Sequence, residues 1–205
     1  FQKNEMLKRL ERLIAKYRPK KVMINGDLKH EFSRNLPQEW AEVSEVLDYL
    51  EGRVELQLTR GNHDNYLKTI LSKRGLELRK KIGLRGITCA HGHEDLEWKG
   101  ILVMGHEHPS VRLRDEIGAS IKVPCFLVGD KVIVLPAFSP LAYGTDATLL
   151  EPISPPLKRI EFGSLRVYTV DEKVGLLDFG RVEELVRGYQ VADSPDRLRR
   201  RRKVF

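Results

Sequence analysis

The sequence predicts an α/β fold in which a two-sheet β-sandwich core is flanked by helices, and three observations lead to this prediction. Helix-like and strand-like segments alternate over residues 4–73, and short strand-like segments dominate residues 84–180. The histidines lie in four short segments that each contain Gly, with Asp or Asn in two of them, at junctions between predicted strands and loops. Alternating helices and strands are typical of helix-covered parallel sheets, which bind ligands beyond the carboxyl ends of their strands. We therefore expect a ligand site at these ends.

The elements of the first half follow from the spacing of apolar residues and from the positions of proline and glycine. Pro19 stops the first helix, Pro37 begins the second and Gly52 ends it. The expected elements are helices at 4–17, 37–51 and 65–73, a buried strand at 21–24 and an alternating strand at 54–58.

The second half predicts mainly strands. We expect a two-residue turn at Gly129-Asp130, irregular chain over 136–156 and a short helix near 181–188. The expected strands are 87–90, 101–104, 121–128, 131–135, 165–170 and 174–179. We expect one domain over residues 1–188, followed by a basic, disordered tail over 189–205.

Composition sets broad limits on function. The chain has 205 residues, a net charge of +7 and a pI near 9.4, which favours anionic partners such as nucleic acid. The sequence contains no apolar run as long as a membrane-spanning helix, so no membrane partner is expected. Cys89 and Cys125 lie in apolar strand-like segments and are expected to be buried free thiols in a reducing cytoplasm. The high content of charged residues, 32%, is typical of thermophiles.

All six histidines lie in four short segments, and this clustering predicts a metal site. His91 and His93 are separated by one residue, as are His106 and His108, so extended backbone would place each pair on one side of its strand. Two adjacent imidazoles repel each other when protonated, and a metal ion between or beside them removes this conflict. Histidine is also the commonest metal ligand in proteins.

Two further segments supply oxygen ligands. In Gly26-Asp27, an aspartate at the end of a buried strand can bridge two cations, although Gly-Asp is also a common turn. In Gly61-Asn62-His63-Asp64, the amide oxygen of Asn62 can bind a metal and His63 can protonate a substrate oxygen. The alternative for this segment is a turn with an asparagine at positive φ.

These segments, in this order, resemble the calcineurin-like metallophosphoesterase superfamily, whose pattern is Asp-x-His, Gly-Asp, Gly-Asn-His-Asp/Glu, His and Gly-His-x-His. Residues 26–108 contain the last four blocks, and Gly-Asp-Leu-Lys-His-Glu-Phe is most similar to the archaeal and bacterial ICC-like branch. The resemblance implies the four-layer α/β/β/α fold and two divalent metal ions. It implies that Asp27 bridges the metals, that Asn62, His91 and His106 complete one site, that His108 binds the other, that His63 is catalytic, and that His30, Asp64 and His93 contact and orient the ligands.

The sequence lacks the Asp-x-His block, which supplies two ligands of one metal in the resembled family. We therefore expect the first strand of the fold to be missing from this chain and to be present in the full-length gene product, although a natural pseudoenzyme is an alternative. The two divalent metal ions that the resemblance implies would clamp the phosphoryl oxygens of a substrate and activate a water molecule. Mixed nitrogen and oxygen ligands favour Mn, with Fe, Zn or Ni also suitable.

Three hypotheses for function follow. The first is a phosphodiesterase or nuclease, because no large insertion precedes His91 to cap the site and the segment after Gly-Asp differs from that of Ser/Thr phosphatases. The second is a phosphatase or cyclic-nucleotide phosphodiesterase for small substrates. The third is a non-catalytic scaffold or nucleic-acid-binding subunit. The basic tail is either a solvated terminus or an arm for DNA or RNA, and its cations are Arg197, Arg199, Arg200, Arg201, Arg202 and Lys203.

Overall fold

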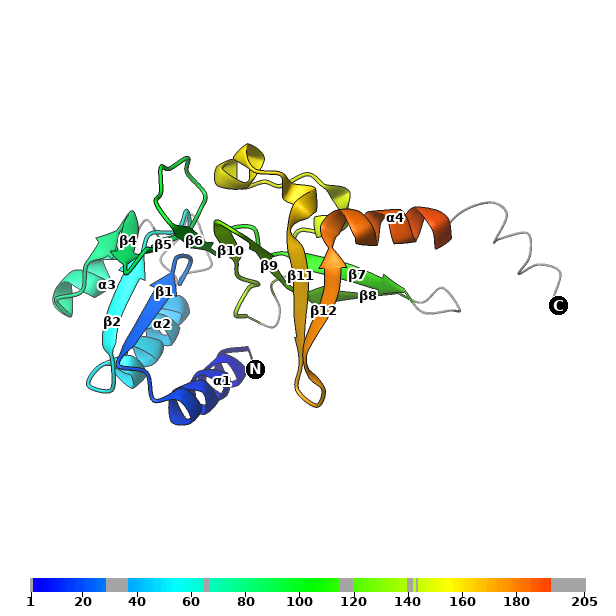
Figure 1. Ribbon diagram of the computed structural model, residues 1–205. Coiled ribbons are helices and arrows are strands. Elements are labelled where there is room, and N and C mark those ends of the chain that lie inside the picture. Colours follow the sequence, from blue (N-terminus) through cyan, green and yellow to red (C-terminus); the bar gives the residue numbers. More distant parts are fainter. Residues whose placement is uncertain are drawn as a thin grey trace.

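The computed structural model describes residues 2–28, 37–64, 67–114, 120–139, 142 and 144–192 (Figure 1). Its α-helices are α1 (Gln2–Tyr17), α2 (Pro37–Leu50), α3 (Lys68–Lys73) and α4 (Val182–Ala192), and its short 3-10 helices are η1 (Ala147–Leu149), η2 (Pro155–Arg159) and η3 (Phe162–Ser164). The strands are β1 (Lys21–Asn25), β2 (Glu55–Thr59), β3 (Leu78–Arg79), β4 (Lys81–Leu84), β5 (Ile87–Ala90), β6 (Ile101–Met104), β7 (Ser110–Arg114), β8 (Ser120–Pro124), β9 (Phe126–Gly129), β10 (Val132–Val134), β11 (Arg166–Asp171) and β12 (Gly175–Arg181).

The first half of the chain forms a parallel three-stranded sheet in the order β1-β2-β3. Helices α2 and α3 cover this sheet with their apolar residues, among them Leu47 and Leu71, which pack against Leu58 of β2. Burial of these side chains is worth about 1.5–3 kcal/mol each and holds the layer together. The carboxyl ends of β1 and β2 therefore lie side by side at one edge of a rigid unit.

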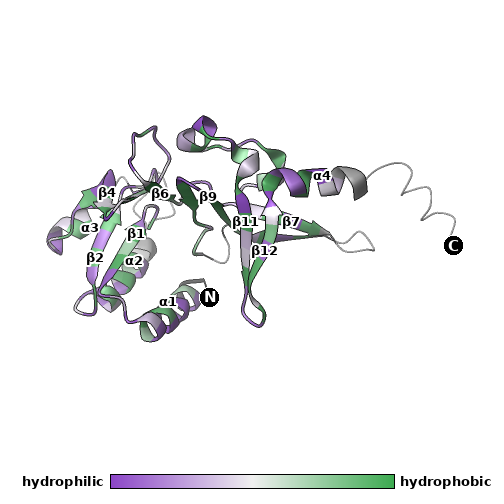
Figure 2. Cartoon of the chain, viewed as in Figure 1, coloured by the Kyte–Doolittle hydropathy of each residue, from purple (hydrophilic) through white to green (hydrophobic). Residues whose placement is uncertain are grey.

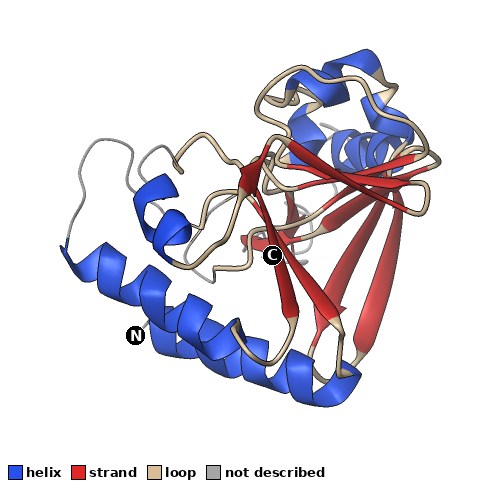
Figure 3. Cartoon of the chain, turned by 90° about the vertical axis from the view of Figure 1, so that its left-hand side faces the viewer, coloured by secondary structure: helices blue, strands red, loops and turns tan. Residues whose placement is uncertain are grey.

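The second half forms a mixed seven-stranded sheet in the order β12-β11-β9-β10-β6-β5-β4, with β7 and β8 as a separate hairpin. Leu102, Leu127 and Val134 of its central strands are fully buried and pack against Leu157 of η2 and Val182 of α4. Figure 2 shows the resulting hydrophobic colouring of β6 and β9, and Figure 3 shows helices in two groups on opposite sides of the strands. The predicted α/β class with sheets flanked by helices is confirmed.

Several boundaries differ from the prediction. The expected strand over 121–128 is interrupted at Cys125, where β8 ends in the hairpin and β9 begins in the seven-stranded sheet. Gly129 pairs with Val132, so the turn consists of Asp130-Lys131 instead of Gly129-Asp130. Helix α4 continues to Ala192, beyond the expected end of the domain at residue 188, and residues 193–205 lie outside the described part.

Strand β1 is half-buried along its whole length, whereas the sequence predicted a buried strand. The reason is its position, because β1 is an edge strand that pairs only with β2 among the described residues. Its last residue, Asn25, reaches the other sheet, where its amide Nδ2 donates to the carbonyl oxygen of Val103 in β6 (3.0 Å). The two sheets thus meet at the strand ends where the histidines lie.

Two simpler expectations can be compared with the described residues. Cys89 and Cys125 are buried free thiols, as predicted, and burial raises the pKa of Cys125 to about 12. In the described part of the chain, every helix is too short or too polar to cross a membrane.

Candidate metal centre

The backbone after β1 turns sharply to place Asp27. Gly26 and Asp27 both have positive φ, +84° and +51°. The positive φ favours glycine at position 26. Space also excludes a side chain there, because a Cβ would lie 2.4 Å from Nδ1 of His91. The glycine therefore allows the strand end and the His91 ring to approach each other closely.

A second connection, after β2, packs against the first. A Cβ on Gly61 would lie 2.0 Å from Oδ1 of Asp27. The buried carboxylate of Asp64 accepts hydrogen bonds from the backbone N–H groups of Asp27 and Gly61, both at 2.8 Å, and the N–H of His63 donates to Oδ1 of Asp27 (3.0 Å). Asp64 thus links the two connections, and the His63 N–H fixes the direction of the Asp27 carboxylate.

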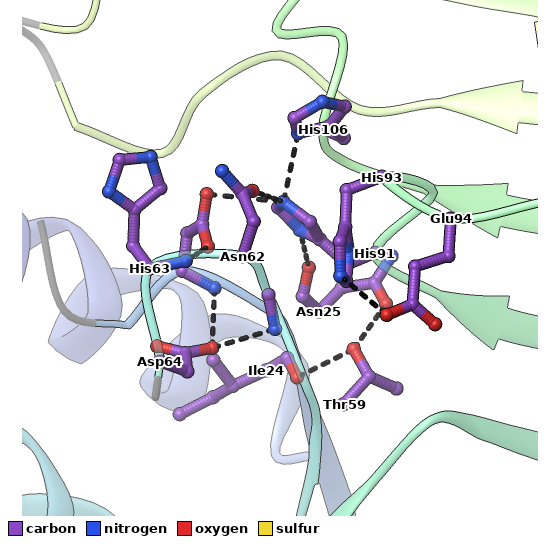
Figure 4. A network of polar contacts seen from close by, with 12 residues as sticks. Ile24, Asn25, Thr59, Asn62, His63, Asp64, His91, His93, Glu94 and His106 are labelled. Carbon is purple, nitrogen blue, oxygen red and sulfur yellow. Dashed lines mark hydrogen bonds and ion pairs between the residues drawn. The ribbon is translucent and has the colours of Figure 1, made fainter. Parts of the chain in front are cut away.

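His91 is the centre of the cluster and is almost fully buried (Figure 4). Its Nδ1 lies 3.0 Å from the carbonyl oxygen of Asn25, an acceptor that fixes the proton on this nitrogen. Its Nε2 lies 3.1 Å from Oδ2 of Asp27, 3.2 Å from Oδ1 of Asn62 and 3.2 Å from Nδ1 of His106. The backbone of His106 is held in turn, since its N–H donates to the carbonyl oxygen of His91 (2.9 Å).

These distances fit the ligands of one metal ion. Ring nitrogens and carboxylate oxygens bound side by side to a small divalent cation, with bonds near 2.1 Å, lie about 3.0–3.4 Å apart. Ligand atoms of Asp27, His91 and His106 all lie within 4.8 Å of one another, and the amide oxygen of Asn62 faces the same point. A ring nitrogen carries at most one proton and cannot donate to three neighbours, whereas a cation between these four atoms satisfies them all.

Electrostatics favour a cation at this point. Burial alone lowers the pKa of His91, but the hydrogen bond and charge of Asp27 outweigh it and raise the pKa above its usual value. Burial and then the charge on His91 lower the pKa of His106 to about 4, and the same two causes lower the pKa values of His93 and His108. Burial would raise the pKa of Asp27, yet His91 and the His63 N–H hold it below the usual range. The cluster therefore keeps its carboxylate ionised, and of these four histidines only His91 binds a proton more tightly than a free imidazole does.

The remaining predicted residues lie around this group. His93 packs beside His91 and His106, with ring centroids 5.3 and 6.0 Å away, and its Nε2 lies 3.4 Å from Oε1 of Glu94. His108 has φ +44° and lies in a turn, not in the extended chain that the sequence suggested. His106 lies in the same turn, because β6 ends at Met104. His30 and the tail cations Arg197–Lys203 lie outside the described residues.

His63 lies at the edge of the cluster. Its backbone is fixed by the hydrogen bond to Asp27. Figure 4 shows its ring extending away from Asp64, on the side of Asn62. A ring in this position can donate a proton to a group bound beside the cluster.

Sequence reasoning missed three residues that organise the site. Asn25 orients His91 through its carbonyl oxygen, while the buried Thr59 hydroxyl donates to its side-chain oxygen (2.8 Å). Glu107, 1% exposed, lies between His106 and His108, and its two oxygens accept the N–H groups of Ile153 (3.2 Å) and Ser154 (3.0 Å). Polar residues at strand ends, next to the recognised blocks, were the available signal.

The sequence profile described as calcineurin-like phosphoesterase matches residues 1–140. The chain belongs to this family. It is thus a metallophosphoesterase, a phosphoester hydrolase of a metal-dependent family, and the Asp/His/His group is its possible metal-binding group.

The fold of this calcineurin-like phosphoesterase is also found in a solved structure. The crystal structure of Pseudomonas putida nuclease MPE matches with a TM-score of 0.61 and 24% sequence identity, over 82% of this chain and 75% of that one. This similarity confirms the metallophosphoesterase α/β fold. No protein with a curated description matches the chain.

Proposed function

We propose that this protein is a metal-dependent phosphodiesterase or nuclease that works with Mn²⁺. The observation that carries the proposal is the convergence of Asp27, Asn62 and His106 on Nε2 of His91. These four residues are the proposed ligands of one cation. His63 is the proposed catalytic residue, with Asp64 and His93 as residues that orient the others.

A bound divalent cation supplies Lewis-acid chemistry, which draws charge from phosphoryl oxygens and makes water a better nucleophile. The chain supplies the rest. Asp27 and Asn62 would hold that cation through their fixed oxygens. Water attacks phosphorus, the bond from phosphorus to the leaving oxygen breaks, and the His63 ring protonates that oxygen. General acid catalysis of this kind contributes about 10²–10⁴ in rate.

Three observations favour a nucleic acid strand over a small phosphate ester as the substrate. The chain carries a net charge of +7, which attracts polyanions. The solved structure of similar fold is titled a nuclease. Between Asp64 and His91 the described residues form only the short helix α3, the strands β3 to β5 and their connections, without an inserted cap. We also propose a cytoplasmic location, because a reducing compartment suits the two buried free thiols, Cys89 and Cys125.

The second cation has half of its ligand set in the described part of the chain. Asp27 and His108 are its proposed ligands, and burial lowers the pKa of the His108 ring, which favours the neutral form that binds a metal. The outer edge of β1 has no described partner strand. We infer that a strand ending in Asp-x-His pairs there in the active enzyme and completes this second site.

Metal titration and hydrolysis test the proposal together. Isothermal titration of the 205-residue chain with Mn²⁺ is expected to give one tight site, and two equally tight sites would contradict the half set. With Mn²⁺ and the completing strand present, the protein is expected to hydrolyse bis(p-nitrophenyl) phosphate and oligonucleotides.

Two variants separate binding from catalysis. His63→Ala is expected to keep Mn²⁺ binding and lose about 10²–10⁴ in kcat. His91→Ala is expected to lose both binding and activity, because it removes the central ligand. The enzyme proposal fails if the complete protein with Mn²⁺ turns over no phosphoester, or if His63→Ala is as active as the wild type.

A further inference from the structure

A cavity adjoins the cluster on the side of His93, and no part of the proposed reaction uses it. It has a volume of about 220 Å³, and its inner wall consists of His91, Gly92 and His93. Figure 4 shows His93 and Glu94 on the opposite side of His91 from His63. The cavity therefore lies away from the leaving group that His63 would protonate, on the side where the retained part of a diester would extend.

The cavity is bordered by cations at the connection between the two sheets. Arg60 follows β2, and its N–H donates to the carbonyl oxygen of Arg79 (2.8 Å). Lys80 and Lys81 follow directly and line the same cavity. Three cationic side chains thus border the cavity whose inner wall includes His91 and His93.

The carboxylates that line this cavity are largely engaged with basic groups. Arg159 binds Asp95 (2.7 Å) and Glu97 (2.8 Å), and Glu94 lies 3.7 Å from Nζ of Lys80. Three permanent cations, those of Arg60, Lys80 and Lys81, and three carboxylates line the cavity. Arg159, which lies outside this lining, binds two of the three carboxylates and offsets their charge. The buried Nδ1 of His93 has no hydrogen-bond partner among the described residues, so this ring can turn to a ligand.

We propose that this cavity is a phosphate subsite, which binds the phosphate adjoining the cleaved bond on the retained side of a nucleic acid strand. Arg60 and Lys81 hold the phosphate, and His93 contacts it from the inner wall. This inference rests on the proposed function for its orientation. It deepens that proposal, because a small diester has no second phosphate to place there.

Binding of a short single-stranded oligonucleotide, labelled with a fluorophore, tests the subsite without metal or turnover. In chelator, Arg60→Gln and Lys81→Gln are each expected to weaken binding about tenfold at low salt. Each is also expected to reduce the slope of log K against log salt by about 1. Lys173→Gln, on the exposed turn between β11 and β12, is the matched control and should bind as the wild type does. Thermal unfolding of each variant shows that the fold is kept.

Hydrolysis supplies an independent readout. With Mn²⁺ and the completing strand present, the two variants are expected to lose about tenfold more kcat/KM on the oligonucleotide than on bis(p-nitrophenyl) phosphate. Equal losses on both substrates, or binding and salt slopes equal to those of Lys173→Gln, would overturn the subsite. Absence of hydrolysis in the wild type overturns the proposed function alone, since the binding measurement still decides the subsite.

Discussion

Replacing Glu107 with glutamine tests how the buried carboxylate between His106 and His108 stabilises the segment at Ile153 and Ser154. The carboxylate is 1% exposed, and each of its oxygens accepts one backbone N–H, from Ile153 and from Ser154. Glutamine has one acceptor oxygen, so its amide N–H₂ must face the second donor. Hydrogen bonds to charged groups contribute about 1.5–3 kcal/mol each, and neutral ones about 0.5–1.5 kcal/mol. Losing one bond and the charge on the other should therefore cost about 2–4 kcal/mol.

Urea unfolding in chelator measures this cost without any contribution from metal. Thermal unfolding gives a second measure. In a domain of this size, 1 kcal/mol shifts the melting temperature by about 2–4 °C, so Glu107→Gln should lower the melting temperature by about 5–15 °C. Glu172→Gln removes a carboxylate that is 85% exposed and should change stability by less than about 0.5 kcal/mol. If Glu107→Gln is no more costly than Glu172→Gln, the buried carboxylate does not hold the 153–154 segment as inferred.

Three further predictions concern the metal ligands. Gly61→Ala should weaken Mn²⁺ binding at least tenfold by calorimetry, because its Cβ would lie 2.0 Å from Oδ1 of Asp27. The control Gly83→Ala has open space around its Cβ and should bind Mn²⁺ as the wild type does. Equal affinities of the two variants would contradict the close packing at Gly61. Mn²⁺ at 100 times its Kd should add about 2.7 kcal/mol to the free energy of unfolding, and this gain should vanish in His91→Ala. In chelator, stability should fall as the pH drops from 6.5 to about 4, because the unfolded chain binds a proton that His106, with its lowered pKa, refuses when folded. His106→Gln should flatten this slope, and a wild-type slope of the opposite sign would show that the raised pKa of His91 dominates instead.

Much of the fold was predictable because its main elements have strong apolar periodicity. The longer helices and the strands β5, β6 and β10 to β12 lie close to their predicted positions, and β8 and β9 overlap one longer predicted strand. Three strands were missed, β3, β4 and β7, because they are short or interrupted by charged residues and glycine, as in Lys81–Leu84. Tertiary pairing, not local preference, makes them strands. The break at Cys125 was also invisible, since an uninterrupted apolar run does not reveal a change of sheet.

The histidine cluster was predictable from its sequence blocks, but not for the geometric reason first given. Alternation in extended chain does not bring His106 toward His91, because His106 lies in a turn whose N–H groups donate to the carbonyl oxygen of His91. Asn25 was missed as an orienting residue because its role depends on contacts with residues 66 and 78 positions away. Sequence spacing cannot reveal such partners.

The two apolar cores and the contacts of Asn25 have a mechanical consequence. One core belongs to the three-stranded sheet and its helices, and the other to the seven-stranded sheet. Asp27 and Asn62 come from the first unit, and His91 and His106 from the second. A cation held by all four would cross-link two units that could otherwise open separately. Opening of the junction would then release the ion, so the lifetime of a bound metal would measure how tightly the two halves of the molecule stay closed.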